Sequence, residues 1–305
     1  MSKWVAVAIM VLLAGGAVAQ QQLPAGGKDF KAGLKALEKK DMDASITAFE
    51  AALAANPDLF GSHYYLGIAY DSKKNYPKSG ENFAKFLERA GDNAEAAEQI
   101  AYATRRGGIA LARTKNSAKA IPYLEKAAAA KPNDKEVHYY LGMALIRNEQ
   151  ESKAEQHFSK VIQLDPNLPR PYYFVGRVAF NTEDWGEAKR LLSKYLELKP
   201  DDNFAADAHF MLGSMAVRQA VGAADAATQN NSAKMHLTKF LELKPNAPQA
   251  PEAYYILGSL AAQSEDTATA TGHFQKYLKL QPQGAQAEEV KQFLADLSEG
   301  EEEGS

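Results

Sequence analysis

The sequence contains no cysteine, and this absence excludes several kinds of chemistry. Without a thiol the protein forms no disulfide, binds no metal through a thiolate, has no cysteine nucleophile and lacks the lipidated cysteine of a bacterial lipoprotein. A strong charge of either sign is also missing, because the formal net charge at pH 7 is only −3. Since no overall basic field is available to attract nucleic acid, we expect no nucleic-acid partner.

The motifs of common catalytic sites are missing as well. The sequence has no H-E-x-x-H zinc motif, no G-x-S-x-G nucleophile elbow and no glycine-rich phosphate loop that ends in Lys and Ser or Thr. What remains is the composition of a folded protein, with 305 residues of which 46% are hydrophobic and 24% charged. We therefore predict a protein that is not an enzyme and holds no cofactor.

The first residues have the pattern of an export signal. Lys3 supplies a positive start, a short apolar run extends from Trp4 to Leu13, and residues 17–19 form an A-x-A cleavage site. A membrane span needs about 20 apolar residues, so this run fits a cleaved signal better than a retained anchor. We predict a signal peptide at residues 1–19, a linker at residues 20–27 and no stable membrane anchor after cleavage. The expected location is the periplasm, with full secretion as the alternative.

Glycine and proline recur with one period along the rest of the chain. Gly33 and Gly67 are 34 residues apart, and the same interval separates Gly108, Gly142 and Gly176. A period of this length indicates copies of one small structural unit that stack on each other. The prolines that close the copies are Pro57, Pro132, Pro166, Pro200, Pro245 and Pro282.

The copy at residues 135–166 shows the pattern most completely. A Leu-Gly pair lies in its first half, Ala154 and Phe158 lie in its second half, and Pro166 closes it. A 34-residue period with L-G, then A-x3-F, then P resembles the tetratricopeptide repeat (TPR) family. The resemblance implies an all-α fold, a right-handed α-solenoid of about seven helix-turn-helix repeats over residues 28–282. The repeats are expected at residues 26–57, 60–91, 101–132, 135–166, 169–200, 206–245 and 251–282.

Steric arguments explain the pattern within each copy. Glycine has no Cβ, so the second helix can approach the first closely, and Phe or Leu fills the remaining space. Residues 92–100 are expected to extend the first helix of the third copy, and residues 221–231 to form a loop in the sixth. Apolar residues at helical spacing predict a capping helix at residues 285–297, followed by a disordered acidic tail at residues 298–305.

Six histidines are the remaining candidates for metal ligands. Three occupy the fourth position of a first helix, and three come immediately before the central Phe or Leu of a second helix. The best pair for a metal is His138 with His157, but zinc prefers three or four ligands. We therefore predict that the histidines are repeat substitutions and form no metal site. The two groups are His63, His138 and His209, and His157, His236 and His273.

The resemblance also implies a concave surface lined by the first helices. The fifth position of these helices, which faces inward in the family, is aromatic in six of the seven repeats. An aromatic and arginine-bearing groove suits an extended peptide with acidic groups or a free carboxylate. The alternative is that the rings only pack against the neighbouring repeat. The predicted peptide-binding residues are Tyr64, Arg105, Arg113, Tyr139, Met143, Arg147, Tyr173, Arg177, Phe210, Arg218 and Tyr255.

Two functions are consistent with this sequence. The first is a non-catalytic exported scaffold that binds a protein or peptide partner through the groove. The alternative is a structural subunit or assembly factor of an envelope, outer-membrane or secretion complex that docks through other faces. The identity of the partner and the oligomeric state do not follow from the residues.

Overall fold

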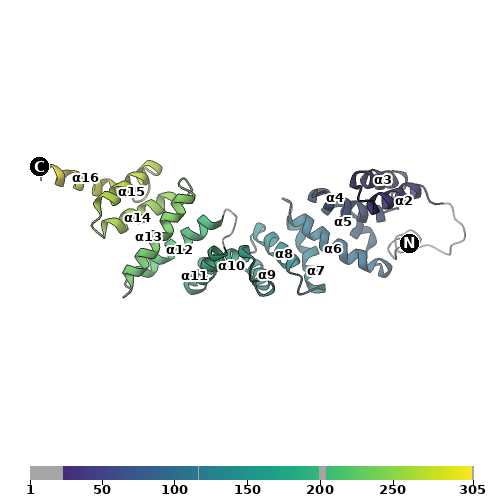
Figure 1. Cartoon of the computed structure of the whole chain (residues 1–305), viewed down its shortest axis with the longest axis horizontal. Helices are drawn as coiled ribbons and strands as arrows, with labels where there is room; N and C mark the ends of the chain where they lie inside the picture. Colours follow the sequence, from purple (N-terminus) through teal and green to yellow (C-terminus); the bar gives the residue numbers. More distant parts are fainter. Residues whose placement is uncertain (1–22, 116, 199–203, 304–305) are drawn as a thin grey trace. The chain divides into compact units, whose positions relative to one another are not determined.

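The computed structural model describes residues 23–115, 117–198 and 204–303, and all regular structure in these ranges is helical, with no strand (Figure 1). The predicted all-α class is therefore confirmed. The predicted signal peptide, residues 1–19, lies outside the described residues. Among the described helices, none combines the length and the apolar character that a membrane span requires.

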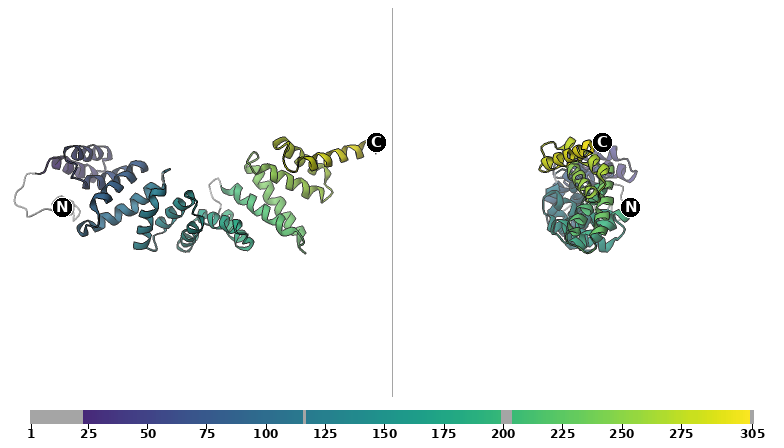
Figure 2. Two further views of the ribbon diagram at one scale, coloured as in Figure 1. Left: turned by 180° about the vertical axis from the view of Figure 1, so that it is seen from behind. Right: turned by 90° about the vertical axis from the view of Figure 1, so that its left-hand side faces the viewer.

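The chain divides into two compact units, and the N-terminal unit ends at Pro166. Its helices pack in consecutive pairs, α2 on α3, α4 on α5 and α8 on α9 (Figures 1 and 2). The helices of this unit are α2 (Gly27–Glu38), α3 (Met42–Ala55), α4 (Gly61–Ser72), α5 (Tyr76–Ala90), the 3-10 turn η1 (Ala94–Ala96), α6 (Ala97–Ala112), the 3-10 turn η2 (Ser117–Ala120), α7 (Ile121–Ala130), α8 (Lys135–Arg147) and α9 (Glu151–Leu164).

The C-terminal unit begins at Asn167 and repeats the same arrangement. α10 packs on α11, α12 on α13 and α14 on α15, and α16 covers the end of the last pair. Its helices are α10 (Pro169–Asn181), α11 (Trp185–Glu197), α12 (Phe204–Ala220), α13 (Ala226–Leu243), α14 (Ala250–Ala262), α15 (Thr267–Leu280) and α16 (Ala287–Glu303).

Short polar side chains start several of the helices. Asp41, Asn75 and Asp134 each accept a hydrogen bond from the backbone N–H three residues later, at the starts of α3, α5 and α8. Asp184 and Asp266 do the same for α11 and α15. Such a cap satisfies one of the free N–H groups of the first turn and stabilises a helix by about 1 kcal/mol.

The repeat glycine lets the two helices of a pair touch. A Cβ built on Gly142 would lie 2.8 Å from the ring of Phe158, and one built on Gly67 would lie 2.7 Å from the ring of Phe83. Carbon atoms that are not bonded pack at about 3.5–4.0 Å, so these positions have no room for a larger residue. The predicted steric role of the glycine is confirmed.

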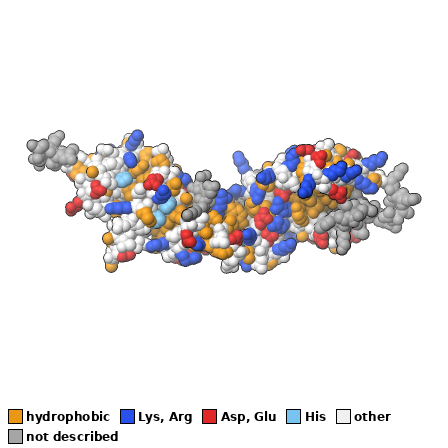
Figure 3. Space-filling model, viewed as in Figure 1, with side chains coloured by type: hydrophobic (Ala, Val, Ile, Leu, Met, Phe, Trp, Pro, Cys, Tyr) orange, Lys and Arg blue, Asp and Glu red, His pale blue; other side chains and the backbone are white. Residues whose placement is uncertain are grey.

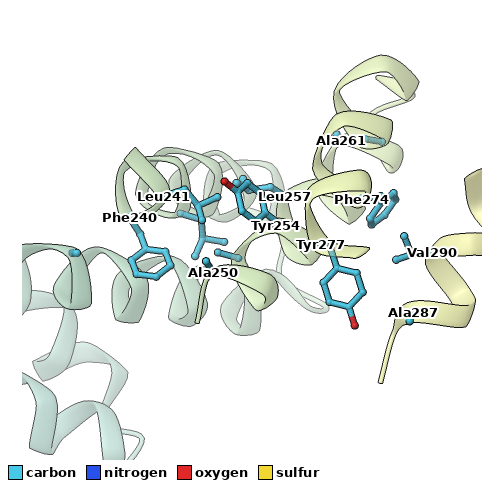
Figure 4. Close-up of a cluster of buried hydrophobic side chains, with 14 residues drawn as sticks. Phe240, Leu241, Ala250, Tyr254, Leu257, Ala261, Phe274, Tyr277, Ala287 and Val290 are labelled. Atoms are coloured by element: carbon cyan, nitrogen blue, oxygen red, sulfur yellow. The ribbon is translucent and has the colours of Figure 1, made fainter. Parts of the chain in front are cut away.

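The core consists of several hydrophobic clusters that lie within and between the helix pairs. In the C-terminal unit, aromatic rings from α13, α14 and α15 meet aliphatic side chains from α16 (Figure 4). Phe240, Tyr254, Phe274 and Tyr277 are all buried there, and Val290 of α16 closes the cluster. α16 therefore shields apolar surface that the last repeat would otherwise expose to water.

Three segments differ from the sequence-based expectations. Residues 226–231, expected to be loop, belong to α13, because Ala226 and Ala227 are strong helix formers at the start of an existing helix. α16 continues past residue 297 to Glu303, since glutamates also favour helix. The expected linker ends before residue 27, because Gly27 starts α2 and donates a hydrogen bond to the carbonyl of Pro24.

Candidate functional site

α8 carries an accessible stripe on the side opposite its core residues. Tyr139, Met143 and Arg147 recur every fourth residue, which places them on one face of the helix, and none of them is buried. The ring of Tyr139 meets that of Tyr140 edge to face, with 5.3 Å between ring centres, and its other edge approaches Phe158 of α9. Three of the predicted binding residues therefore share one exposed surface.

Arg113, at the end of α6, lies between two tyrosines from neighbouring helices. Its guanidinium lies 4.5 Å from the ring centre of Tyr76 and 4.8 Å from that of Tyr140, and it donates hydrogen bonds to both hydroxyls. Burial raises the pKa of Tyr140, so this phenol stays neutral at physiological pH. The contact fixes the position of Arg113 and leaves its positive charge uncompensated.

Arg147 is held in a similar way by neutral oxygens. Its guanidinium donates hydrogen bonds to the backbone carbonyls of Ala112 and Thr114, where α6 ends. Such carbonyls carry the partial negative charge of a helix terminus and attract a cation. Arg113 and Arg147 together border a hollow of about 620 Å³. Among its described lining residues the other charged ones are Lys115 and Lys119, and none is a carboxylate.

Arg105, a predicted peptide-binding residue, forms ion pairs within the protein. Its guanidinium lies 2.6 Å from a carboxylate oxygen of Asp134 and 2.7 Å from one of Glu136, both at the start of α8. Arg106 beside it pairs with Asp71 of α4. These side chains form a mostly neutralised network that links α4, α6 and α8, so Arg105 acts as a structural residue and not as a cation offered to a ligand.

Two of the predicted aromatic residues are buried. Tyr64 is 9% exposed and packs against Phe86 of α5, and Tyr173 is 3% exposed. The ring of Tyr173 stacks on that of Phe204 at 4.5 Å between centres. Phe30, at the same repeat position, is 2% exposed. For these three rings the structure supports the packing alternative.

The two other aromatic residues that were predicted to bind the peptide in the C-terminal unit, Phe210 and Tyr255, are half-buried. Phe210 contacts the ring of Phe240, with 5.1 Å between ring centres. The Tyr255 hydroxyl lies 3.0 Å from both carboxylate oxygens of Glu289 in α16. Each ring keeps part of its surface accessible, but each also has a partner within its own unit.

The predicted arginines of the C-terminal unit lie over aromatic rings. The guanidinium of Arg177 is 5.7 Å from the ring centre of Phe174, and that of Arg218 is 5.7 Å from the ring centre of Trp185. Arg218 is exposed and also lies 3.7 Å from a carboxylate oxygen of Glu183. The structure thus separates the predicted peptide-binding residues into buried or paired residues and accessible ones. The accessible cluster consists of Arg113, Tyr139, Met143 and Arg147, at α6 and α8 of the N-terminal unit.

The sequence-based assignment omitted several residues of that cluster. Tyr140 follows the fifth repeat position and Tyr76 starts a second helix, so neither occupies a position that faces inward in the family. Lys115 and Lys119 lie in the connection between α6 and α7, which repeat periodicity does not describe. The adjacent pair Tyr139-Tyr140 was the one available signal.

The histidines form close pairs inside single repeats. The Nδ1 atoms of His138 and His157 are 2.9 Å apart, and so are those of His209 and His236. The structure brings together His138 and His157, the best pair in the sequence analysis, and pairs His209 with His236 in the same way, because the fourth position of a first helix faces the second helix of the same repeat. No group of three or more His, Cys, Asp or Glu residues that could hold a metal occurs in the described ranges.

These pairs make stability depend on pH. Burial, followed by the charges of His209 and Lys189, lowers the pKa of His236 to about 4. A folded-state pKa below the unfolded value of about 6.5 means that the unfolded chain binds the proton more tightly, so this stability is complete above pH 6.5 and is lost as pH falls towards 4. We expect His236 alone to reduce the free energy of unfolding by about 1–2 kcal/mol between pH 7.5 and pH 5.

Urea denaturation with EDTA present measures this effect in the wild type and in His236→Asn. Asn is the matched replacement, because Asn82 already accepts a hydrogen bond from His63 at the equivalent positions of another repeat, at 2.8 Å. The variant should lose less stability on acidification than the wild type. Parallel pH curves for the two proteins would show that the pair does not carry the effect.

Comparison with known proteins identifies the fold. A family model described as tetratricopeptide repeat matches residues 30–90, 105–169 and 217–285, which together exceed half of the chain. No curated protein matches the sequence.

Three solved structures illustrate the likeness. The C-terminal part of a TPR repeat-containing protein from Cytophaga hutchinsonii is 16% identical, with 86% of this chain and 98% of that chain covered and a TM-score of 0.56. YrrB, described as a TPR protein with an unusual peptide-binding site, is 22% identical, with 59% and 89% covered and a TM-score of 0.49. PilF of Pseudomonas aeruginosa is 16% identical, with 74% and 95% covered and a TM-score of 0.48. At these identities the likeness shows the fold alone.

Proposed function

Because the chain belongs to the tetratricopeptide repeat family, a protein-interaction fold, we propose that it is a scaffold that binds an extended peptide segment with acidic groups or a free carboxylate. The proposed binding surface, the tyrosine–arginine face, consists of Tyr76, Arg113, Tyr139, Tyr140, Met143 and Arg147.

The main support for this proposal is a difference between two pairs of arginines. Arg105 and Arg106 are paired with carboxylates, whereas Arg113 and Arg147 are held by tyrosine hydroxyls and backbone carbonyls. A guanidinium bound to neutral oxygens is pre-organised but keeps its full charge, so an incoming carboxylate gains a charge-assisted hydrogen bond without displacing an internal partner. Lys115 and Lys119 add two further positive charges around the same hollow.

The rings beside these arginines supply the apolar part of the surface. Tyr139 and Tyr140 are half-buried and are held edge to face, so their exposed edges offer contact area at little cost in side-chain entropy. Met143 lies between Tyr139 and Arg147 on the same face of α8 and adds an adaptable apolar contact. The combination suits a segment with alternating acidic and apolar side chains.

Selection from a peptide library on the purified chain tests this proposal. We expect the enriched peptides to be acidic and to lose at least tenfold in affinity, which corresponds to about 1.4 kcal/mol, for the Arg113→Gln/Arg147→Gln variant. Glutamine keeps an amide donor for the neutral partners while it removes the charge. Lys153→Gln on α9, an exposed lysine outside the face, is the control. Acidic peptides that bind the arginine variant as tightly as the wild type would refute the proposal.

We also propose export to the periplasm, with full secretion as the alternative. The support is the sequence of residues 1–19, with a positive start, a short apolar run and an A-x-A site. Mass spectrometry of the protein from cell fractions should find Gln20 as its first residue in the periplasmic fraction. An intact Met1 on cytoplasmic protein would contradict export.

A second candidate function is a subunit or assembly factor that docks through another face. A larger hollow of about 1010 Å³ lies on α5, α6 and α7, and it shares no residue with the tyrosine–arginine face. Its lining includes Leu87, Ile100 and Leu111 together with lysines and glutamates. A partner seated there would leave Arg113 and Arg147 free of contact.

A further inference from the structure

Each of the two histidine pairs places two ring nitrogens side by side, as in a pair of metal ligands. Each pair joins the first and second helix of one repeat, His138 on α8 with His157 on α9 and His209 on α12 with His236 on α13. The same positions are thus used once in each unit. The two pairs lie in different units, so each pair is formed only by residues of its own unit.

Hydrogen bonds assign the tautomer of His138. Its Nε2 lies 3.0 Å from the backbone carbonyl oxygen of Pro132, which can only accept, so we assign the proton of this ring to Nε2. The Nδ1 of His138 then carries a lone pair directed at Nδ1 of His157, which donates to it in the metal-free protein. A ring that donates its far N–H to a backbone carbonyl is the usual arrangement of a histidine that ligates a metal, because it fixes the ring orientation.

The spacing of the nitrogens, already set by the hydrogen bond, also fits two neighbouring ligands at a right angle. Metal–nitrogen bonds to histidine are about 2.0–2.1 Å long, so two ligands at about 90° to each other lie about 2.9 Å apart. The observed separation is 2.9 Å in both pairs. A tetrahedral zinc site would require a wider separation, whereas the square-planar or tetragonal sites of copper and nickel have right angles between neighbouring ligands.

We propose that each pair, His138 with His157 and His209 with His236, binds one divalent copper ion through the two Nδ1 atoms, with water in the remaining positions. On binding, both rings tilt so that their Nδ1 lone pairs leave the line between the two nitrogens and converge on the metal. The proton on Nδ1 of His157 leaves and a proton is taken up at Nε2, so the ring stays neutral and the metal replaces the shared hydrogen bond. Copper is the expected metal because it lies at the maximum of the affinity order for nitrogen ligands.

The protein covers both pairs only in part. His157, His209 and His236 are half-buried, and His138 is 8% exposed. Histidine side chains of the C-terminal unit reach the surface on the face seen in Figure 3. Lys239 and Glu242 of α13 are the charged residues that act on His209, and they pair with each other at 2.8 Å.

Copper titration of the full chain by calorimetry at pH 7.5 tests the proposal. We expect two copper ions per chain, with nickel weaker and zinc weakest. His157→Asn should reduce the number to one, and His157→Asn/His236→Asn to zero, while His273→Asn leaves two. Asn is the natural occupant at the equivalent position, where Asn82 accepts a hydrogen bond from His63, so the variants have a folded precedent within the chain.

Electron paramagnetic resonance of the copper-loaded wild type gives a readout that does not depend on any variant. The spectrum should show tetragonal copper with coupling to two imidazole nitrogens. Absence of this coupling, or unchanged copper binding by the folded double variant, would overturn the proposal.

Discussion

Tyr173→Ala is expected to lower the free energy of unfolding of the C-terminal unit by about 3 kcal/mol. The ring is 3% exposed, stacks on Phe204 at 4.5 Å and lies 5.5 Å from the ring centre of Tyr195, so its removal leaves a cavity that the two rings cannot fill. Chemical denaturation followed by circular dichroism measures the loss.

Tyr139→Ala is the matched comparison. The ring occupies the same repeat position as Tyr173 but is only half-buried, so we expect a loss of about 1 kcal/mol and an intact helical signal. A loss as large as that of Tyr173→Ala would show that Tyr139 is a core residue. It would then be unavailable for the proposed binding surface.

Gly142→Ala should destabilise the N-terminal unit by about 2 kcal/mol. The added Cβ would lie 2.8 Å from the ring of Phe158, which is fully buried and cannot turn away. This cost outweighs the gain of about 1 kcal/mol that alanine gives over glycine inside a helix. Thermal and urea denaturation should both report the loss.

Gly272→Ala supplies the control with the opposite sign. Gly272 is also inside a helix, α15, but a Cβ built there has no atom within 4 Å apart from its chain neighbours and the nearby backbone of its own helix. Only the propensity gain remains, so this variant should be more stable than the wild type by up to about 1 kcal/mol. Two variants of equal stability would contradict the steric account of the repeat glycine.

Periodicity predicted most of the fold. The spacing of glycine, small residue and Phe or Leu fixes which helix faces which, so the contact of Gly142 with Phe158 follows from the sequence. Periodicity does not predict the structure of segments that depart from the repeat. The helical start of α13 within residues 226–231 depends on local helix propensity, which the comparison of copies does not include.

Less of the candidate site than of the fold could be predicted from the sequence. The repeat position of a ring does not decide its burial, because Tyr173, which stacks on Phe204 at the start of α12, is 3% exposed while Tyr139 at the same position is half-buried. Likewise Arg105 and Arg113 both belong to the first helix of one repeat, but only Arg105 has Asp134 and Glu136 within reach. Whether a residue has a structural role or is available to a ligand depends on its side-chain partners. The repeat period does not specify these partners.

Site-specific photo-crosslinking in living cells tests the central claim most directly. A photoreactive amino acid is placed at Met143, within the tyrosine–arginine face, or at Lys126, an exposed residue of α7 in the larger hollow. Proposed binding through the tyrosine–arginine face predicts a discrete crosslinked partner at position 143 that disappears with Arg113→Gln/Arg147→Gln, and no such product at position 126. A partner captured at position 126 and not at position 143 would contradict the proposal and favour docking through the α5–α7 hollow.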